Sequence, residues 1–257
     1  MRNSWASTGS QLSRIAWPPE AWNLPLTILA AFAGLIVAVA PAVVYFATIS
    51  AAGGIAPADS AHVPPEQLLL AQLVTYPPLG IYLLFVVRAL GHRTFAELGF
   101  RMPSARELGI GLLGALVMVL VVDLLTSALE SLTHQHATET AIAILRAMHS
   151  PGQRALFALV AVVLAPLVEE LAFRVFLFNA ISRYASVAVA ALGSGIVFGL
   201  AHAAGPNQFL TISVPLAVAG IVLAYVYAAT RCYWANVCTH AIFNAVAVVA
   251  VFAFHAT

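Results

Sequence analysis

Long runs of apolar residues, separated by short polar segments, make up most of the chain from residue 26 onward. About 20 consecutive apolar residues in a helix are needed to cross the apolar core of a bilayer, which is about 30 Å deep. Seven runs approach or exceed that length and predict seven membrane-spanning helices, at residues 26–50, 68–90, 108–129, 155–180, 186–204, 209–229 and 234–254. We therefore expect an all-α fold, a polytopic transmembrane helix bundle in which residues 25–257 form a single domain.

Two further segments have a pattern of their own. The segment 130–154 is the longest connection between the predicted spans, and its stretch 138–148 begins with polar residues and continues with apolar ones. This pattern predicts a short interfacial or re-entrant helix, or alternatively a partial eighth span. Residues 1–24 contain three tryptophans, and indole rings prefer the headgroup level of a membrane, so this segment is predicted to lie at the interface.

Arginine is distributed unevenly among the segments outside the spans. Cytoplasmic loops of membrane proteins are enriched in arginine and lysine. With the N-terminus inside, eight arginines fall on the inner side and two on the outer side: Arg2, Arg14, Arg88, Arg93, Arg101, Arg106, Arg183 and Arg231 against Arg146 and Arg154. We therefore predict an integral membrane protein, of the cell inner membrane, with a cytoplasmic N-terminus and with the segment 130–154 outside.

The composition agrees with residence in a lipid bilayer. Apolar residues make up 62% of the chain and charged residues only 8%, against about 25% charged residues in soluble domains. The formal net charge is +1 and no run of basic residues occurs, which excludes nucleic acid as a main partner. The two cysteines, Cys232 and Cys238, match no metal-binding spacing.

Ionisable residues within the predicted spans concentrate in the last hundred residues. A charge at bilayer depth is costly, so its presence indicates a functional site. The span 155–180 contains Glu169, Glu170 and Arg174. Glu170 and Arg174 are four residues apart in the acid-first order that favours an ion pair, whereas Glu169 points about 100° away from that pair. A buried pair could simply tie two helices together, but this would not explain the second carboxylate.

Two later spans each carry a pair of residues at four-residue spacing, Phe198 with His202 and His240 with Asn244. This spacing places both members of a pair on one helical face. At about 1.5 Å per helical residue, these residues and Glu169 fall at similar depths, so we expect one polar site near the bilayer midplane. A carboxylate can take a proton from water, imidazoles can hold that water or a metal, and an amide N–H can stabilise an oxyanion.

Glu169, His202 and His240 would also make an open zinc site, with one position left for water. The sequence does not decide whether a divalent metal such as zinc is used as a cofactor.

The three motifs, in this order, resemble the EExxxR, FxxxH and HxxxN/B motifs of the CPBP family, the CAAX-protease and bacteriocin-processing intramembrane endopeptidases also called Abi proteins. The resemblance places a catalytic core at about residues 153–254. It implies hydrolysis of a peptide bond in a membrane-anchored or membrane-embedded peptide or protein substrate.

The resemblance also implies a role for each motif residue. By similarity, Glu169 is the base that activates water, and His202 holds that water or a metal. His240 and Asn244 line the oxyanion site. The resemblance further implies two supporting roles for neighbouring residues, with Glu170 and Arg174 shaping the site and Phe198 packing beside it.

Two other functions compete with proteolysis. One is a catalytically silent relative that binds a membrane peptide, such as an immunity protein, and the other is a transporter, in which buried Glu, Arg and His are also ordinary. Against the transporter, the polar residues lie in one half of the chain and no inverted repeat is visible. The joint presence of Glu169, His202, His240 and Asn244 favours the enzyme, because a pure binder could lose any of them.

Two features of the third predicted span stand apart from these motifs. Asp123 is a charge within the span that the motifs do not explain, and pairing with an Arg or a His, or alternatively a catalytic role, would account for it. The segment 109–114 matches GxGxxG, but no strand precedes it, so the pattern indicates close helix packing and not a dinucleotide site.

Overall fold

The structure of the protein is a computed structural model that describes residues 24–52, 63–91, 94–134, 140–202 and 209–254. Six helices within these ranges are long and apolar enough to cross a membrane. They are α2 (Leu24–Ala51), α3 (Pro65–Gly91), α4 (Ala105–Thr133), the continuous helix Pro151–Ser182, the continuous helix Phe209–Thr230, and α11 (Tyr233–Phe254). The expected all-α transmembrane bundle is confirmed.

Each of the seven predicted spans is helical, but the fifth is short. That span, predicted at 186–204, contains α9 (Val187–Ala201), which has only 15 residues. The predicted short helix in 138–148 is α5 (Thr140–Arg146), whose seven residues are too few for an eighth span. The predicted interfacial segment 1–24 lies almost entirely outside the described residues and stays a prediction.

Serine side chains fix where three of the helices begin. Ser104 caps α4 and Ser150 caps the helix that starts at Pro151, each in a capping box with the residue three positions later. Ser186 caps α9 by accepting a hydrogen bond from the backbone N–H of Val189. Such caps satisfy N–H groups that have no partner within the helix, so the short polar segments between spans set the helix boundaries.

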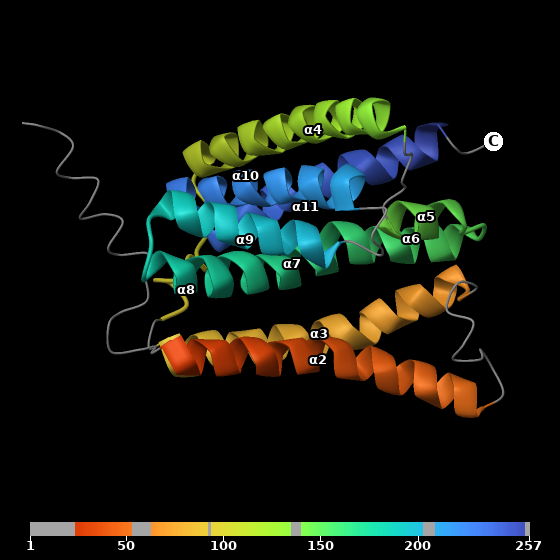
Figure 1. Cartoon of the computed structure of the whole chain (residues 1–257), viewed down its shortest axis with the longest axis horizontal. Helices are drawn as coiled ribbons and strands as arrows, with labels where there is room; N and C mark the ends of the chain where they lie inside the picture. The colour runs from red at the N-terminus through yellow and green to blue at the C-terminus, as the bar shows by residue number, and fades with distance from the viewer. Residues whose placement is uncertain (1–23, 53–62, 92–93, 135–139, 203–208, 255–257) are drawn as a thin grey trace, which may run out of the picture.

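The helices form a bundle in which α2 and α3 pack together along one edge and α4 lies along the opposite edge (Figure 1). Between them lie α9, α10 (Val214–Thr230), α11 and the long helix Pro151–Ser182. Five of the arginines predicted to face the inside lie at or beside helix termini. All five are at the end of the bundle that holds the start of α2 and the last residues of α3, namely Arg88, Arg101, Arg106, Arg183 and Arg231. Arg146 and Arg154 lie at the opposite end, so the charge asymmetry is a property of the fold, whereas the orientation in the membrane stays a prediction.

Small residues let several helices approach closely. A Cβ atom added to Gly199 of α9 would lie 2.2 Å from the carbonyl oxygen of Ser213, and one added to Gly195 would lie 2.5 Å from Cγ1 of Ile221. On α4, a Cβ on Gly111 would lie 2.6 Å from Oγ1 of Thr239. Close approach of backbones at small residues is typical of membrane bundles, and the expected packing role of the 109–114 segment is confirmed at Gly111.

Large apolar side chains are exposed along the outside of the bundle. On α2, for example, Leu29, Phe32 and Ile36 each expose more than 60% of their surface. Exposed apolar surface of this extent indicates a hydrophobic surrounding and not water. The outer surface of the bundle is therefore suited to contact lipid.

Candidate active site

The long helix that carries the two glutamates changes its hydrogen-bond register around them. It consists of α6 (Pro151–Leu159), the π-helical η2 (Val160–Leu164), α7 (Ala165–Glu170), the π-helical η3 (Leu171–Phe178) and α8 (Asn179–Ser182). π-Helical turns within α-helices are frequent at functional sites. The two glutamates end α7 and are therefore flanked by widened turns on both sides.

A proline and an asparagine explain how the first widened turn is stabilised. In η2 the backbone N–H of Ala165 bonds to the carbonyl of Val160, five residues back. In the same register residue 166 would donate to Ala161, but Pro166 has no N–H. The side chain of Asn244 on α11 donates to that carbonyl instead, with 2.8 Å between its Nδ2 and the Ala161 oxygen.

A second bond from α11 holds the same helix within α7, six residues after Ala161. The hydroxyl of Tyr233 donates to the carbonyl of Leu167 at 2.6 Å. Together with the bond from Asn244, this anchors the segment before Glu169 to α11 at two points.

Glu170 is the centre of a buried polar cluster. Its Oε1 lies 3.1 Å from Nη1 of Arg174 and 2.8 Å from Nδ1 of His240, and its Oε2 accepts a hydrogen bond from Asn236. Glu170 and Arg174 are both fully buried, and their expected pairing is present. Asn236 was not predicted, although it stands four residues before His240 and on the same face of α11.

Arg174 connects Glu170 to two further helices. Its Nη2 donates to the carbonyl of Gly220 on α10 at 3.0 Å. Its guanidinium carbon lies 4.9 Å from the centre of the Phe198 ring on α9, which is a favourable cation–π distance. The pair therefore also ties helices together, as the simpler interpretation of the sequence proposed.

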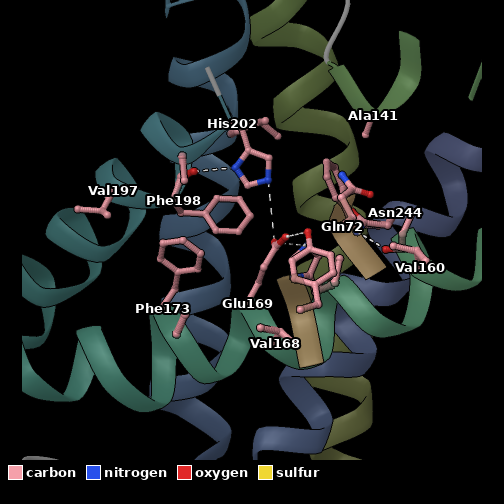
Figure 2. A pocket seen from close by; sticks show the side chains of 18 of the residues that line it. Gln72, Ala141, Val160, Val168, Glu169, Phe173, Val197, Phe198, His202 and Asn244 are labelled. Carbon is pink, nitrogen blue, oxygen red and sulfur yellow. Dashed lines mark hydrogen bonds and ion pairs between the residues drawn. The ribbon is translucent and has the colours of Figure 1, made fainter. Parts of the chain in front are cut away.

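Glu169 points the other way and meets both imidazoles. Its Oε2 lies 3.9 Å from Nε2 of His202 and 3.8 Å from Nε2 of His240. Because both nitrogens lie within 4 Å of one oxygen, they are less than 8 Å apart. The structure thus brings together the three residues that the sequence placed in one site, and Figure 2 shows the Glu169 carboxylate and the His202 ring turned toward each other.

Tyr76 on α3 completes the surroundings of Glu169. Its hydroxyl donates to Oε1 of Glu169 at 3.2 Å. Sequence reasoning did not select Tyr76, because its only distinguishing feature is a position before two consecutive prolines, Pro77 and Pro78, in an apolar helix. Its role depends on the packing of α3 against α7, which local pattern does not reveal.

The second nitrogen of each imidazole fixes the tautomer. Nδ1 of His202 lies 2.7 Å from the carbonyl oxygen of Phe198, and a carbonyl only accepts hydrogen bonds. Nδ1 of His240 faces the Glu170 carboxylate, which also accepts. In both neutral rings Nδ1 therefore carries the hydrogen and Nε2 presents a lone pair toward Glu169. The set can accept both protons of a water molecule, or it can face a cation.

Phe198 separates this set from the buried arginine. Its ring centre lies 4.6 Å from that of His202 and 5.7 Å from that of His240, while Arg174 stands over the same ring. The expected packing of Phe198 beside the imidazoles matches this arrangement.

The site opens into a cavity of about 940 Å³ that extends between α2, α3, α4, α9 and α11. Glu169, His202, His240 and Asn244 all line it, as do Tyr76 and residues that the motifs do not include. The volume is within the range of cavities that bind organic ligands. A peptide segment can therefore be accommodated next to the polar set.

The arrangement does not fit a zinc ion as it stands. Ligands about 2.0–2.1 Å from a tetrahedral zinc are about 3.4 Å from one another, and the Glu169–His distances of 3.8 and 3.9 Å are wider. Among the residues that the structure describes, no group of three His, Cys, Asp or Glu side chains is placed to hold a metal ion. Use of a divalent metal stays a prediction, and no step below depends on it.

Comparison with protein-family models gives a match over part of the chain. Residues 151–246 match the family model described as Rce1-like, type II CAAX prenyl endopeptidase Rce1-like. The matched part runs from the first residue of α6 into α11 and includes both glutamates, Arg174, both histidines and Asn244. No curated protein and no solved structure matches the chain.

Proposed function

We propose that the protein is an intramembrane endopeptidase of the CAAX-protease type that hydrolyses a membrane-anchored or membrane-embedded peptide or protein, because residues 151–246 match the Rce1-like family model. The observation that carries this proposal is the convergence of one carboxylate and two imidazoles with fixed tautomers on the wall of a cavity. A catalytic base needs both a free lone pair and a fixed direction, and these contacts supply both.

The proposed reaction begins with a water molecule held by Glu169 and by Nε2 of His202. Glu169 takes one proton of this water, and the oxygen attacks the carbonyl carbon of the scissile peptide bond. The carbonyl oxygen becomes an oxyanion. The proton then passes from Glu169 to the amide nitrogen, the oxyanion re-forms the carbonyl as the C–N bond breaks, and a carboxylic acid and an amine are released.

The oxyanion requires a hydrogen-bond donor, and the tautomers restrict which groups can serve. Neutral His240 presents a lone pair at Nε2, so it can donate from Nε2 only when both ring nitrogens carry a hydrogen, and its Nδ1 faces the Glu170 carboxylate. Asn244 uses one amide hydrogen for Ala161 and has a second one. We therefore assign His240 and Asn244 to the oxyanion and treat Glu170 as a positioning residue that acts through His240.

The test compares cleavage by the wild-type protein and by Glu169→Gln. The amide keeps an oxygen for the Tyr76 hydroxyl, so the variant should fold, while loss of a general base typically costs about 10²–10⁴-fold in rate. Glu130→Gln is a matched control, because it removes a carboxylate from α4 that does not line the cavity. Membrane proteomics of cells with each variant should reveal new protein termini with wild type and control that are missing with Glu169→Gln.

Three other results are informative. Cleavage that persists in Glu169→Gln would refute the assignment of the base. Fragments identical in the presence and absence of the protein would favour the silent peptide-binding alternative. Turnover that a chelator abolishes and Zn²⁺ restores would establish the metal-dependent version of the mechanism.

A further inference from the structure

The wall of the cavity carries negative charge and lacks a strong cation. Two carboxylates line it, those of Glu169 and Asp123, and no arginine occurs among the described lining residues. The chain contains no lysine. Arg174 is fully buried behind the Phe198 ring and is bound to Glu170 and Gly220, so it is not available to a ligand.

The contacts of Asp123 do not give it a role in stabilising the fold. It forms neither a hydrogen bond nor an ion pair with any residue that the structure describes, so the expected Arg or His partner is not found there. A charged side chain at the centre of a bilayer costs at least about 2.5 kcal/mol. Asp123 lies within α4, 18 residues after the helix begins.

The position of Asp123 on α4 is not incidental. Four residues of α4 line the cavity, Val119, Val122, Asp123 and Thr126. Their spacing of three, four and seven residues places them on one face of the helix. Asp123 therefore lies on the face of α4 that lines the cavity, and its side chain is exposed.

The wall contributed by α3 is also polar. Gln72, Thr75 and Tyr76 line the cavity from one face of that helix, and Figure 2 draws Gln72 among the side chains of the pocket. A purely hydrocarbon ligand would desolvate these groups and Asp123 without offering them partners, which is unfavourable. The lining is better suited to a peptide.

We infer that Asp123 is a recognition site for a positively charged side chain, lysine or arginine, of the peptide that occupies the cavity. This inference rests on the proposed function and adds a substrate class to it. A free terminal carboxylate in the cavity would face two carboxylates and no arginine among the described lining residues, whereas a cationic side chain would neutralise Asp123. The preferred substrate is therefore a basic peptide segment cleaved at an internal bond.

The experiment uses the full-length protein in nanodiscs of neutral phosphatidylcholine, so that anionic lipid cannot mimic a preference for basic peptides. Internally quenched peptides are prepared in pairs that differ only in having lysine or the uncharged norleucine at one position, and this position is moved along the peptide. In the wild type, kcat/KM should favour lysine by about tenfold at one position, equivalent to about 1.4 kcal/mol. Asp123→Asn should reduce that ratio to about one, while the matched control Glu130→Gln should retain it.

Two results would overturn the inference and leave the protease proposal intact. One is cleavage by the wild type with no preference for lysine or arginine at any position. The other is a preference that survives in Asp123→Asn.

A binding measurement decides the case in which no peptide is cleaved, a result that would count against the proposed function itself. Fluorescence anisotropy with Glu169→Gln should then give a dissociation constant about tenfold lower for the lysine peptide than for its norleucine partner, and Asp123→Asn should remove the difference. Equal affinities, or no binding of either peptide, would overturn the inference.

Discussion

Replacing Arg174 by methionine tests whether the buried ion pair stabilises the bundle. Methionine keeps the length of the apolar stem but removes the charge. The substitution deletes the 3.1 Å contact with Glu170, the hydrogen bond to the Gly220 carbonyl and the cation–π contact with Phe198. Glu170 would remain fully buried without its cationic partner.

The size of the effect follows from what Glu170 retains. Breaking a buried ion pair by removing one partner typically costs about 3–5 kcal/mol. His240 and Asn236 still donate to the carboxylate, so we expect the lower end, about 3 kcal/mol. In the double variant Glu170→Gln/Arg174→Met neither charge remains. Its loss of stability should therefore be about 2 kcal/mol smaller than the sum of the losses in the two single variants, which is within the range of measured couplings.

The assay is reversible unfolding in mixed micelles, with the free energy of unfolding obtained for the wild type, the two single variants and the double variant. Arg183→Met serves as the control, because Arg183 follows α8 at the end of the same long helix and is only partly buried; its effect should stay within about 0.5 kcal/mol. An Arg174→Met protein as stable as the wild type, or a coupling near zero, would refute the role of the ion pair.

Three further predictions concern helix register, helix packing and orientation. Asn244→Leu should lower the free energy of unfolding by about 1–3 kcal/mol because the Ala161 carbonyl loses its donor. Adding Pro166→Ala to this variant should recover part of the loss by restoring a backbone N–H. A double variant no more stable than Asn244→Leu alone would contradict the π-helical register. Gly199→Ala should destabilise the protein by about 1–3 kcal/mol, since the added Cβ would lie 2.2 Å from the Ser213 oxygen. Gly109→Ala is the control and should be neutral, because a Cβ there meets nothing within 4 Å. Thermal unfolding in detergent compares the two variants. With Cys232 and Cys238 replaced, an impermeant maleimide should label a cysteine at Ser104 only from the cytoplasmic side and one at Ser150 only from the opposite side, and labelling of both from one side would refute the orientation.

The sequence predicts those parts of the structure that depend on local spacing. Apolar run length located the seven helical segments, and the four-residue spacing of Glu170 and Arg174 predicted their ion pair. Similar depths in three helices predicted that Glu169 would meet His202 and His240. In each case the periodicity of one helix, or the thickness of the bilayer, is sufficient to set the geometry.

Other parts depend on how helices are placed against one another. Tyr76 reaches Glu169 only because α3 packs against α7. Asn244 supplies the hydrogen bond that Pro166 cannot donate, although the two residues are 78 positions apart in the chain. This requires both the π-helical register of η2 and contact with α11. Neither the register nor the contact has a signature in a single sequence, so Asn244 was predicted only as an oxyanion residue and its structural bond was not foreseen.

The shortness of α9 couples the site to the lipid around it. Fifteen residues rise about 22 Å, roughly 8 Å less than the hydrocarbon depth of an average bilayer, and α9 exposes an apolar stripe of Val189, Leu192, Ile196 and Leu200. Hydrophobic mismatch of this kind is relieved by thinning of the adjacent leaflet, at fractions of a kcal/mol per Å. Headgroups and their water are thereby drawn toward His202, which directly follows the last residue of α9. Lipids with shorter acyl chains should relieve the mismatch further, so in the proposed mechanism acyl-chain length becomes a physical variable that affects how readily water reaches the Glu169 carboxylate.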